Sequence, residues 1–153
     1  LMLACVGEGW CLVSALVGEG ASGNATGKAG WTPLFYAERG DNAHVIELLE
    51  GADLDARADL STAAAHNAAR NGHAAFLDRL LELGADPDAR ESVGLTPLMM
   101  AVSECSLEAV EVLIRRGADV NYRTPMDTTA LGNARVLEFD EIVEALLAGG
   151  ATE

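Results

Sequence analysis

The residues closest to a nucleotide-binding motif lie early in the chain. Gly18, Gly20 and Gly23 have the spacing G-x-G-x-x-G, which in a dinucleotide site joins a strand to a helix and lets the backbone approach a pyrophosphate. Here a helical pattern precedes the glycines, and the residues that follow are poor helix formers. The next segment, 22–30, imitates a phosphate loop around Lys28, but it lacks the first glycine at the right distance and a Ser or Thr after the lysine. We interpret both segments as turns.

Candidate metal ligands are few, and their spacing is unsuitable. The chain has three histidines and three cysteines: His44, His66, His73, Cys5, Cys11 and Cys105. The histidines share no ligand spacing, and no Glu or Cys completes a metal set around them. The cysteines have no metal spacing and cannot all pair, which favours a reducing, cytoplasmic compartment. The sequence therefore implies neither a metal nor any other cofactor.

Catalytic groups are also missing from the sequence pattern. None of the serines lies in a nucleophile elbow. Asp53, Asp86 and Asp119 recur at intervals of 33 residues, which indicates structural turn residues rather than an acid/base pair. The tripeptide Asn24-Ala25-Thr26 is a glycosylation sequon by pattern, which matters only in a secreted protein. We predict that these residues do not form an enzyme.

The elements that must position these residues repeat along the chain. Gly-Ala pairs begin at residues 20, 51, 84, 117 and 150, so the spacings are 31, 33, 33 and 33. Twelve residues after the first four glycines begin the segments TPLFYAERG, AAAHNAARNGH, TPLMMAVSECS and TALGNARVLEF. Self-similarity at a fixed period is the signature of a repeat array.

One unit can be understood from elementary helix chemistry. Thr32 and Thr96 can cap a helix with their hydroxyls, and Pro33 and Pro97 suit the first helical position, where no N–H is needed. A second helix carries an apolar face at helical spacing, as in Phe76, Leu77, Leu80 and Leu81. A glycine free to adopt the left-handed conformation then ends it. Because one helix pair cannot bury this face, neighbouring units must stack.

A period of 33 with a TPLHxAA-like segment before Gly-Ala-Asp resembles the ankyrin repeat. The resemblance covers one array, 1–153, in five units, of which the first is truncated: 1–23, 24–54, 55–87, 88–120 and 121–153. It implies an all-α solenoid of helix-turn-helix units joined by short β-hairpin or turn loops. It also implies a concave surface of hairpins and first helices that binds a protein or peptide, with the second helices behind. His66 and His73 occupy the family's histidine positions, where the resemblance implies hydrogen bonds to backbone across turns and neighbouring units.

A basic column follows the same register. Arg57, Arg90 and Arg123 are separated by 33 residues and fall on successive hairpins. Because acidic residues outnumber basic ones in the chain, one interpretation is that these arginines form a stripe that binds an acidic peptide or carboxylates. The alternative is that each arginine pairs with a nearby acidic residue: Asp55, Asp59, Asp88 or Glu91.

An apolar column occupies one position at the hairpin tips. Its members are Ala29, Leu60, Val93 and Met126. Two residues further on, in their own units, come Trp31 and Leu95, and Tyr36 shares a first-helix position with Met100, whereas Met99 is expected in the core. Turn tips should be polar, so this column predicts an exposed patch for a partner, with Trp31 and Tyr36 as the anchors. The alternative is that these side chains pack against the next hairpin.

Composition limits the kind of partner. The 153 residues are 50% hydrophobic and have a formal net charge of −14, which argues against nucleic acid. The apolar start is interrupted by Gly7, Glu8 and Gly9, so it is too short for a membrane-inserted segment. The acidic residues of the second helices are expected on a solvated convex face: Glu47, Glu50, Asp78, Glu82, Glu108, Glu111, Glu141 and Glu144.

The sequence therefore predicts a monomeric, non-catalytic protein-binding array. The predicted binding residues are Trp31, Tyr36, Arg57, Leu60, Arg90, Val93, Leu95, Arg123 and Met126. One alternative is a regulatory or targeting module of a larger enzyme or effector, which the start at Leu1 and the incomplete first unit favour. Another is a structural spacer that binds nothing specific.

Overall fold

The computed structural model describes residues 1–5, 10–27, 30–48, 51–56 and 63–152. Its elements in chain order are the 3₁₀ helix η1 (Met2–Cys5) and the helices α1 (Trp10–Gly18), α2 (Pro33–Arg39), α3 (Ala43–Leu48), α4 (Ala64–Asn71), α5 (Ala74–Glu82), α6 (Pro97–Ser103), α7 (Leu107–Arg115), α8 (Ala130–Val136) and α9 (Asp140–Ala148). No strand is assigned within the described ranges. The predicted all-α class is therefore confirmed.

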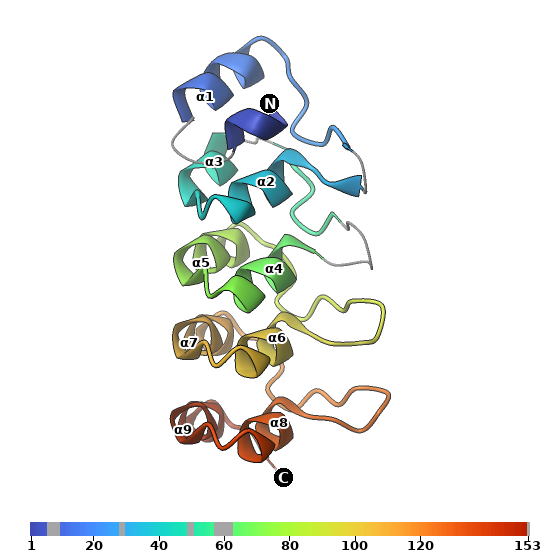
Figure 1. Ribbon diagram of the computed structural model, residues 1–153, viewed down its shortest axis with the longest axis vertical. Coiled ribbons are helices and arrows are strands. Elements are labelled where there is room, and N and C mark those ends of the chain that lie inside the picture. Colours follow the sequence, from blue (N-terminus) through green and yellow to red (C-terminus); the bar gives the residue numbers. More distant parts are fainter. Residues whose placement is uncertain (6–9, 28–29, 49–50, 57–62, 153) are drawn as a thin grey trace.

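The helices form two columns (Figure 1). The first helices α2, α4, α6 and α8 stack below η1, and the second helices α1, α3, α5, α7 and α9 stack beside them. Each first helix packs on its own second helix and on the first helices of adjacent units. The described parts of the loops between units project to the same side, away from the second helices. The molecule is thus a solenoid in which each unit covers the apolar face of the next.

The starts of the first helices follow the capping chemistry only in part. Pro33 and Pro97 occupy the first helical position, as predicted. The hydroxyl of Thr96 accepts a hydrogen bond from the Met99 N–H at 3.5 Å. The prediction is wrong for Thr32, whose hydroxyl caps nothing and is buried without a hydrogen-bond partner among the described atoms. A full side-chain cap is therefore not required at every unit, because the stacked neighbours hold the helix in place.

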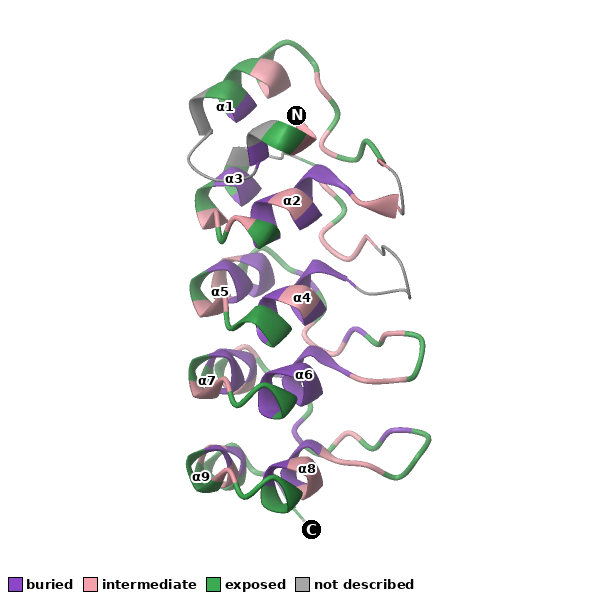
Figure 2. Ribbon diagram, viewed as in Figure 1, coloured by how far each residue is buried: buried purple, intermediate pink, exposed green. Residues whose placement is uncertain are grey.

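The core lies between the two columns, where the burial colouring is darkest (Figure 2). Phe76, Leu77 and Leu80 on α5 have no exposed surface, and Met99 on α6 is 2% exposed, as predicted for a core residue. Fully buried alanines on α4, such as Ala68 and Ala69, let the adjoining helices approach closely. The core is therefore aliphatic and continuous from unit to unit.

Each second helix ends at a residue with left-handed backbone. Gly84 after α5 has φ 103°, and the Ala85 N–H donates to the Leu80 carbonyl at 3.2 Å. Gly20, Gly51, Gly117 and Gly150 have positive φ at the same position. This confirms the predicted role of the repeated glycine.

The turn within a helix pair also needs positive φ, and here the sequence often lacks glycine. Gly72 between α4 and α5 has φ 72°. The equivalent residues in the other units are Asp41, Cys105 and Glu138, with φ of 47°, 57° and 60°. Side chains with a Cβ are disfavoured in this region. The stacking of the units therefore imposes the turn even where the local sequence opposes it.

The loops between units close in one common way. The Gly27 N–H donates to the Trp31 carbonyl at 2.9 Å, and the equivalent bonds are Glu91 to Leu95 at 3.1 Å and Thr124 to Thr128 at 3.0 Å. Gly94 at the tip of one loop has φ 86°, and a Cβ there would lie 2.9 Å from Cδ of Pro125 in the next loop. The tips of these two successive loops therefore lie in close contact.

Candidate binding surface

A ladder of short polar side chains links each loop to the next. The carboxylate of Asp55 accepts from the Asp86 N–H at 3.0 Å, and that of Asp88 accepts from the Asp119 N–H at 2.8 Å. The side-chain oxygens of Asn24 and Asn121 accept equivalent bonds from the N–H groups of Asp53 and Thr152. The ladder fixes the spacing of the loops along the array.

The repeated aspartates are structural, as predicted. Asp53, Asp86 and Asp119 each accept a hydrogen bond from the backbone N–H two residues further on, at 2.9–3.1 Å. This arrangement is the Asx turn. The amide of Asn24 is used in the same framework, since it also donates to the Gly51 carbonyl at 2.9 Å. The asparagine of the sequon therefore has a structural role.

Asp88 is a carboxylate of the ladder whose pKa is raised. Its partial burial raises the pKa of its carboxyl above the ordinary 3.8, and the negative charges of Asp119 and Asp86 act in the same direction. The hydrogen bond from the Asp119 N–H and the charge of Arg90 oppose this shift. The stacking of the loops thus brings negatively charged carboxylates close to one another while it forms the hydrogen bonds of the ladder.

His66 links α4 to the loop of the next unit. It has no exposed surface, and its Nδ1 accepts from the Ala63 N–H at 3.4 Å. Its Nε2 therefore carries the proton and donates to the Leu95 carbonyl at 3.1 Å. This confirms the predicted backbone bonding for His66, and it fixes the position of Leu95.

The predicted backbone partner of the His73 ring is wrong. Its Nδ1 lies 3.0 Å from a carboxylate oxygen of Glu38 rather than from a backbone group. The same oxygen accepts from the Asn71 side-chain amide at 3.0 Å, and the Glu38 side chain is 1% exposed. Sequence reasoning missed this contact because Glu38 replaces a small residue of the repeat pattern. The bond joins α2 to the turn after α4.

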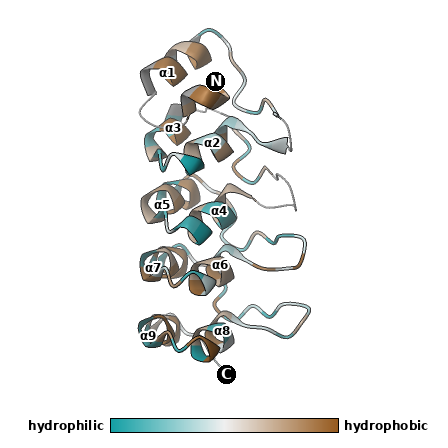
Figure 3. Ribbon diagram, viewed as in Figure 1, coloured by the Kyte–Doolittle hydropathy of each residue, from teal (hydrophilic) through white to brown (hydrophobic). Residues whose placement is uncertain are grey.

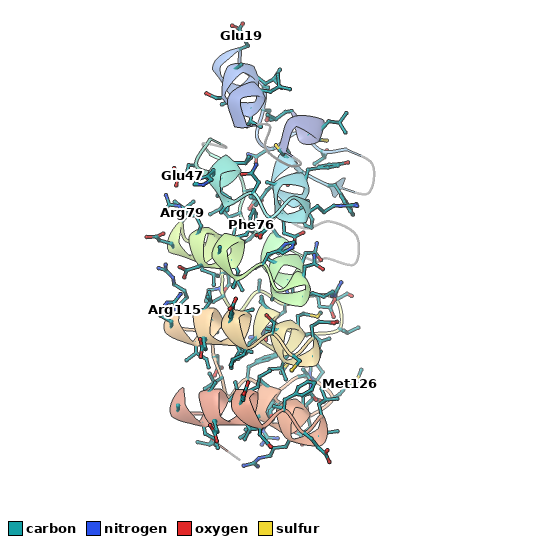
Figure 4. The ribbon with its side chains drawn as sticks, turned by 60° about the vertical axis from the view of Figure 1, so that its left-hand side comes forward. Glu19, Glu47, Phe76, Arg79, Arg115 and Met126 are labelled. Carbon is teal, nitrogen blue, oxygen red and sulfur yellow. The ribbon has the colours of Figure 1, made fainter. Side chains whose placement is uncertain are left out.

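The outer face of the second helices carries an ion-pair network rather than a simply solvated acidic face. Arg79 bridges Glu47 of α3 at 3.0 Å and Glu82 at 2.7 Å. Asp78 is contacted by Arg116 at 2.7 Å and by Arg115 at 3.0 Å. The hydrogen bonds from Arg116 and Arg115 lower the pKa of Asp78. Figure 4 shows Glu47, Arg79 and Arg115 together on this edge.

The hairpin arginines that the structure describes already have contacts within the array. The Arg90 guanidinium lies 4.6 Å from the ring centre of Tyr122 in the next unit, and Arg123 pairs with Asp127 at 2.9 Å. The Arg123 partner differs from the acidic residues expected from the sequence. The charge of Arg90 acts on Asp88, one of the expected partners, by opposing the upward shift of its pKa. Arg57 lies outside the described residues.

The described hairpin-tip side chains point into solvent. Val93 is 51% exposed and Met126 is 78% exposed, and Met126 projects from the side opposite the ion-pair network (Figure 4). Leu95 is half-buried against the core. Ala29 and Leu60 lie outside the described residues. The two described tips therefore favour the exposed-patch interpretation over packing against the next hairpin.

The N-terminal end of this side carries an aromatic cluster. The Trp31 and Tyr36 rings meet edge to face at 5.6 Å, and Phe35 lies 6.1 Å from Trp31. The Arg39 guanidinium lies over the Trp31 ring at 5.5 Å. Trp31 and Tyr36 are half-buried, so each keeps part of its ring accessible. The two predicted anchors thus form one contact group.

The comparison with protein families settles the relationship of the chain. The family model for ankyrin repeats, in three copies, matches residues 1–91 and again residues 65–152. The chain belongs to the ankyrin repeat family. Ankyrin repeats are generally protein–protein interaction modules, and their proteins are mostly non-catalytic.

Three relatives show how the ankyrin repeats of this chain compare with those of known proteins. SH3 and multiple ankyrin repeat domains protein 2 of Homo sapiens is 47% identical over 74 residues, covering 46% of this chain and 4% of that protein. Neurogenic locus Notch protein of Drosophila melanogaster is 33% identical over 147 residues, covering 84% and 5%. B-cell lymphoma 3 protein homolog of Mus musculus is 33% identical over 147 residues, covering 92% and 33%. The chain spans a third or less of each relative's length.

The hollows and ionisable groups of the ankyrin array bear on whether it could bind a small molecule or a metal ion. Two hollows between α7 and α9, of about 330 and 290 Å³, are lined by mixed side chains such as Cys105, Phe139 and Glu111. In the described residues, no three His, Cys, Asp or Glu side chains could hold a metal ion. Burial raises the pKa of the Cys5 thiol to about 11, which disfavours its reactive thiolate form. Among the same residues, no helix is long and apolar enough to cross a bilayer.

Sequence reasoning missed two arginines on the first helices of the ankyrin array. Arg39 and Arg70 are both exposed, and each lies seven residues after the N-cap residue of its helix, Thr32 or Ala63. Arg39 and Arg70 are 31 residues apart, like Gly20 and Gly51, because the second unit is two residues shorter than the period of 33. A search at the regular period therefore does not align them. An alignment of first-helix positions, unit by unit, would have found them.

Proposed function

We propose that this chain is a non-catalytic protein-binding module whose partner lies on the loop and first-helix side of the array. The binding residues would be those predicted from the sequence: Trp31, Tyr36, Arg57, Leu60, Arg90, Val93, Leu95, Arg123 and Met126. The array would comprise five units with the boundaries given above and would act as a monomer in the cytoplasm. Its rigid frame would present these side chains without rearrangement on binding.

One observation carries the proposal. The loop tips expose large apolar side chains, Val93 and Met126, at equivalent positions in adjacent units. Repetition of an exposed apolar residue at a turn tip is unusual for a surface that faces only water. The aromatic cluster around Trp31 lies on the same side, and aromatic side chains contribute strongly to interface energy. A stable interface would bury about 1,000 Å² or more in total, which needs several units together.

The coverage of the relatives supports a second candidate. Because the region matched by this chain makes up only 4–33% of the proteins compared above, this array is suited to be the regulatory or targeting part of a larger enzyme or effector. The two candidates share the same binding surface. They differ in whether partner binding changes an activity located elsewhere in a longer chain.

Substitution of the exposed tips tests the proposal. The double variant Val93→Asp with Met126→Asp should lose the proteins that the wild-type chain captures from a lysate of its source, because a charge would replace each apolar contact. Both side chains are at least half exposed, so far-UV circular dichroism should remain unchanged. Captured proteins are compared by quantitative mass spectrometry.

The matched control is Leu147→Asp on α9, where the leucine is 46% exposed on the second-helix side of the array. This variant should keep the captured set. If the tip variant and the control retain the same proteins, the loop side is not the binding surface. A spacer that binds nothing specific would give no captured set that depends on either substitution.

A further inference from the structure

Arg39 on α2 and Arg70 on α4 are exposed arginines in a chain with an excess of acidic residues. The 24 acidic residues outnumber the 10 basic ones, and Arg79, Arg115, Arg116 and Arg123 each contact a carboxylate. Within the described residues, Arg39 and Arg70 form no ion pair. In that part of the chain, the Arg39 guanidinium lies over the Trp31 ring, and the Arg70 guanidinium donates to the Met100 sulfur at 3.5 Å.

The carboxylate nearest in sequence is held elsewhere. Glu38 precedes Arg39, but its carboxylate is buried and hydrogen-bonded to His73 and Asn71 on the side of α4. It therefore does not lie over Arg39. Figure 3 shows the ends of α2 and α4 as hydrophilic segments, whereas α6 is mostly hydrophobic. The arginines of α2 and α4 lie in adjacent units, whereas the next first-helix arginine, Arg135 on α8, is separated from them by α6, which has no basic residue in its last turn.

From these contacts we infer that Arg39 and Arg70 bind two carboxylates of an acidic, extended peptide segment of the partner. This inference rests on the proposed function, since it names the chemistry of a ligand for the same side of the array. Each guanidinium can form a bidentate pair with a carboxylate. The pair formed by Trp31 and Tyr36 lies beside Arg39 and provides a surface for an adjacent apolar or proline side chain.

The spacing of the two arginines defines the peptide. They occupy equivalent positions on α2 and α4, which pack directly against each other. Packed helices lie about 8–10 Å apart. A polyproline II segment has three residues per turn and rises about 3.1 Å per residue, so side chains three apart lie on one face about 9 Å from each other. Two acidic residues with two residues between them therefore match the two guanidinium groups.

The acidic residues of the second helices do not oppose this site at physiological salt. Glu47 and Asp78, for example, are paired with arginines and lie a helix layer away from Arg39 and Arg70. Charges separated by more than about 8 Å are largely screened at 0.15 M ionic strength. The local positive charge of the two arginines therefore decides which peptide binds.

A nuclear magnetic resonance titration tests the inference. The probe is the peptide acetyl-Ser-Glu-Pro-Pro-Glu-Leu-Ser-amide, added to the intact chain at physiological salt. We expect saturable shifts of the Trp31 indole and of the Arg39 and Arg70 Nε signals, because these groups adjoin the proposed contacts. The peptide with both glutamates replaced by glutamine should bind at least about tenfold more weakly, and the lysine version should not bind.

Matched variants separate local recognition from general charge. Arg39→Gln with Arg70→Gln should weaken binding of the glutamate peptide at least about tenfold, whereas Arg115→Gln should leave it unchanged, because Arg115 is exposed but already paired with Asp78. Equal weakening by both variants would overturn the inference. So would absent shifts, or tighter binding of an oligothymidylate than of the peptide.

The two tests fail separately. If the peptide does not bind while the tip variant still loses its captured proteins, only the acidic chemistry of the ligand is wrong. If the tip variant retains its captured proteins, the proposed binding surface itself is wrong, whatever the peptide does.

Discussion

The stacked core makes Leu80→Ala the most direct test of the architecture. Leu80 lies on α5, has no exposed surface, and belongs to the buried cluster that runs between the two columns of helices. The substitution removes three carbon atoms, which costs about 2–2.5 kcal/mol in lost burial. Because α5 packs against α3, α4 and α7, the surrounding side chains can close the cavity only in part. The total cost should be about 3–4 kcal/mol, within the usual range of about 2–5 kcal/mol.

Urea unfolding followed by far-UV circular dichroism measures this cost. For a chain of this size a loss of about 3–4 kcal/mol lowers the urea midpoint by roughly 1–2 M. The two tryptophans, Trp10 and Trp31, precede the third unit, so their fluorescence reports on the first two units while circular dichroism reports on the whole array. The two probes should move together if neighbouring units stabilise each other.

The control is Leu83→Ala, the same chemical change at the end of the same helix. Leu83 is 43% exposed, so its loss should cost less than about 1 kcal/mol. A change below about 0.5 kcal/mol for Leu80→Ala, or equal changes for the two variants, would refute the stacked core.

Two further substitutions test the contacts between units. Asp88→Asn keeps the oxygen that accepts from the next loop but removes a charge that burial disfavours, so at pH 7 it should raise the free energy of unfolding by several tenths of a kcal/mol. The folded-state pKa of Asp88 is raised, so the wild-type carboxyl favours folding at low pH and loses this contribution as the pH rises. The greater stability of the variant should therefore vanish below pH 3.8, where the carboxyl is protonated in both the folded and the unfolded state. A greater stability that persists below this pH would contradict this reasoning. His66→Ala removes the donor to the Leu95 carbonyl and leaves a buried gap, which should cost about 2–4 kcal/mol by urea unfolding. A cost near zero would mean that this histidine does not couple the two units.

The repeat spacing predicted the architecture because each framework residue has a local physical reason. The glycine after each second helix is needed for left-handed backbone, and proline suits the first position of a first helix. These requirements act within a few residues, so they can be identified in the sequence. The left-handed turns at Asp41, Cys105 and Glu138 could not be predicted in this way, because stacking imposes them against the local preference.

Contacts between units were harder to predict because they depend on side chains about 30 residues apart. The pairing of Arg90 with the Tyr122 ring, and of His73 with Glu38, requires knowledge of which rotamers face the neighbouring unit. A column of basic residues in the sequence does not show which arginines contact other residues of the array and which can bind a partner. The structure makes that distinction for Arg39 and Arg70.

This distinction also determines where specificity can arise in such an array. The polar side chains of the loop ladder are occupied by hydrogen bonds to the next loop, as in Asp55 and Asp88, so changing them to suit a partner would weaken the array. The exposed first-helix and tip positions carry no such bond, and Val93 and Met126 can vary there at little cost in stability. Partner recognition is therefore expected to depend on the residues that depart from the repeat pattern, whereas those that follow it keep the frame rigid enough to present them.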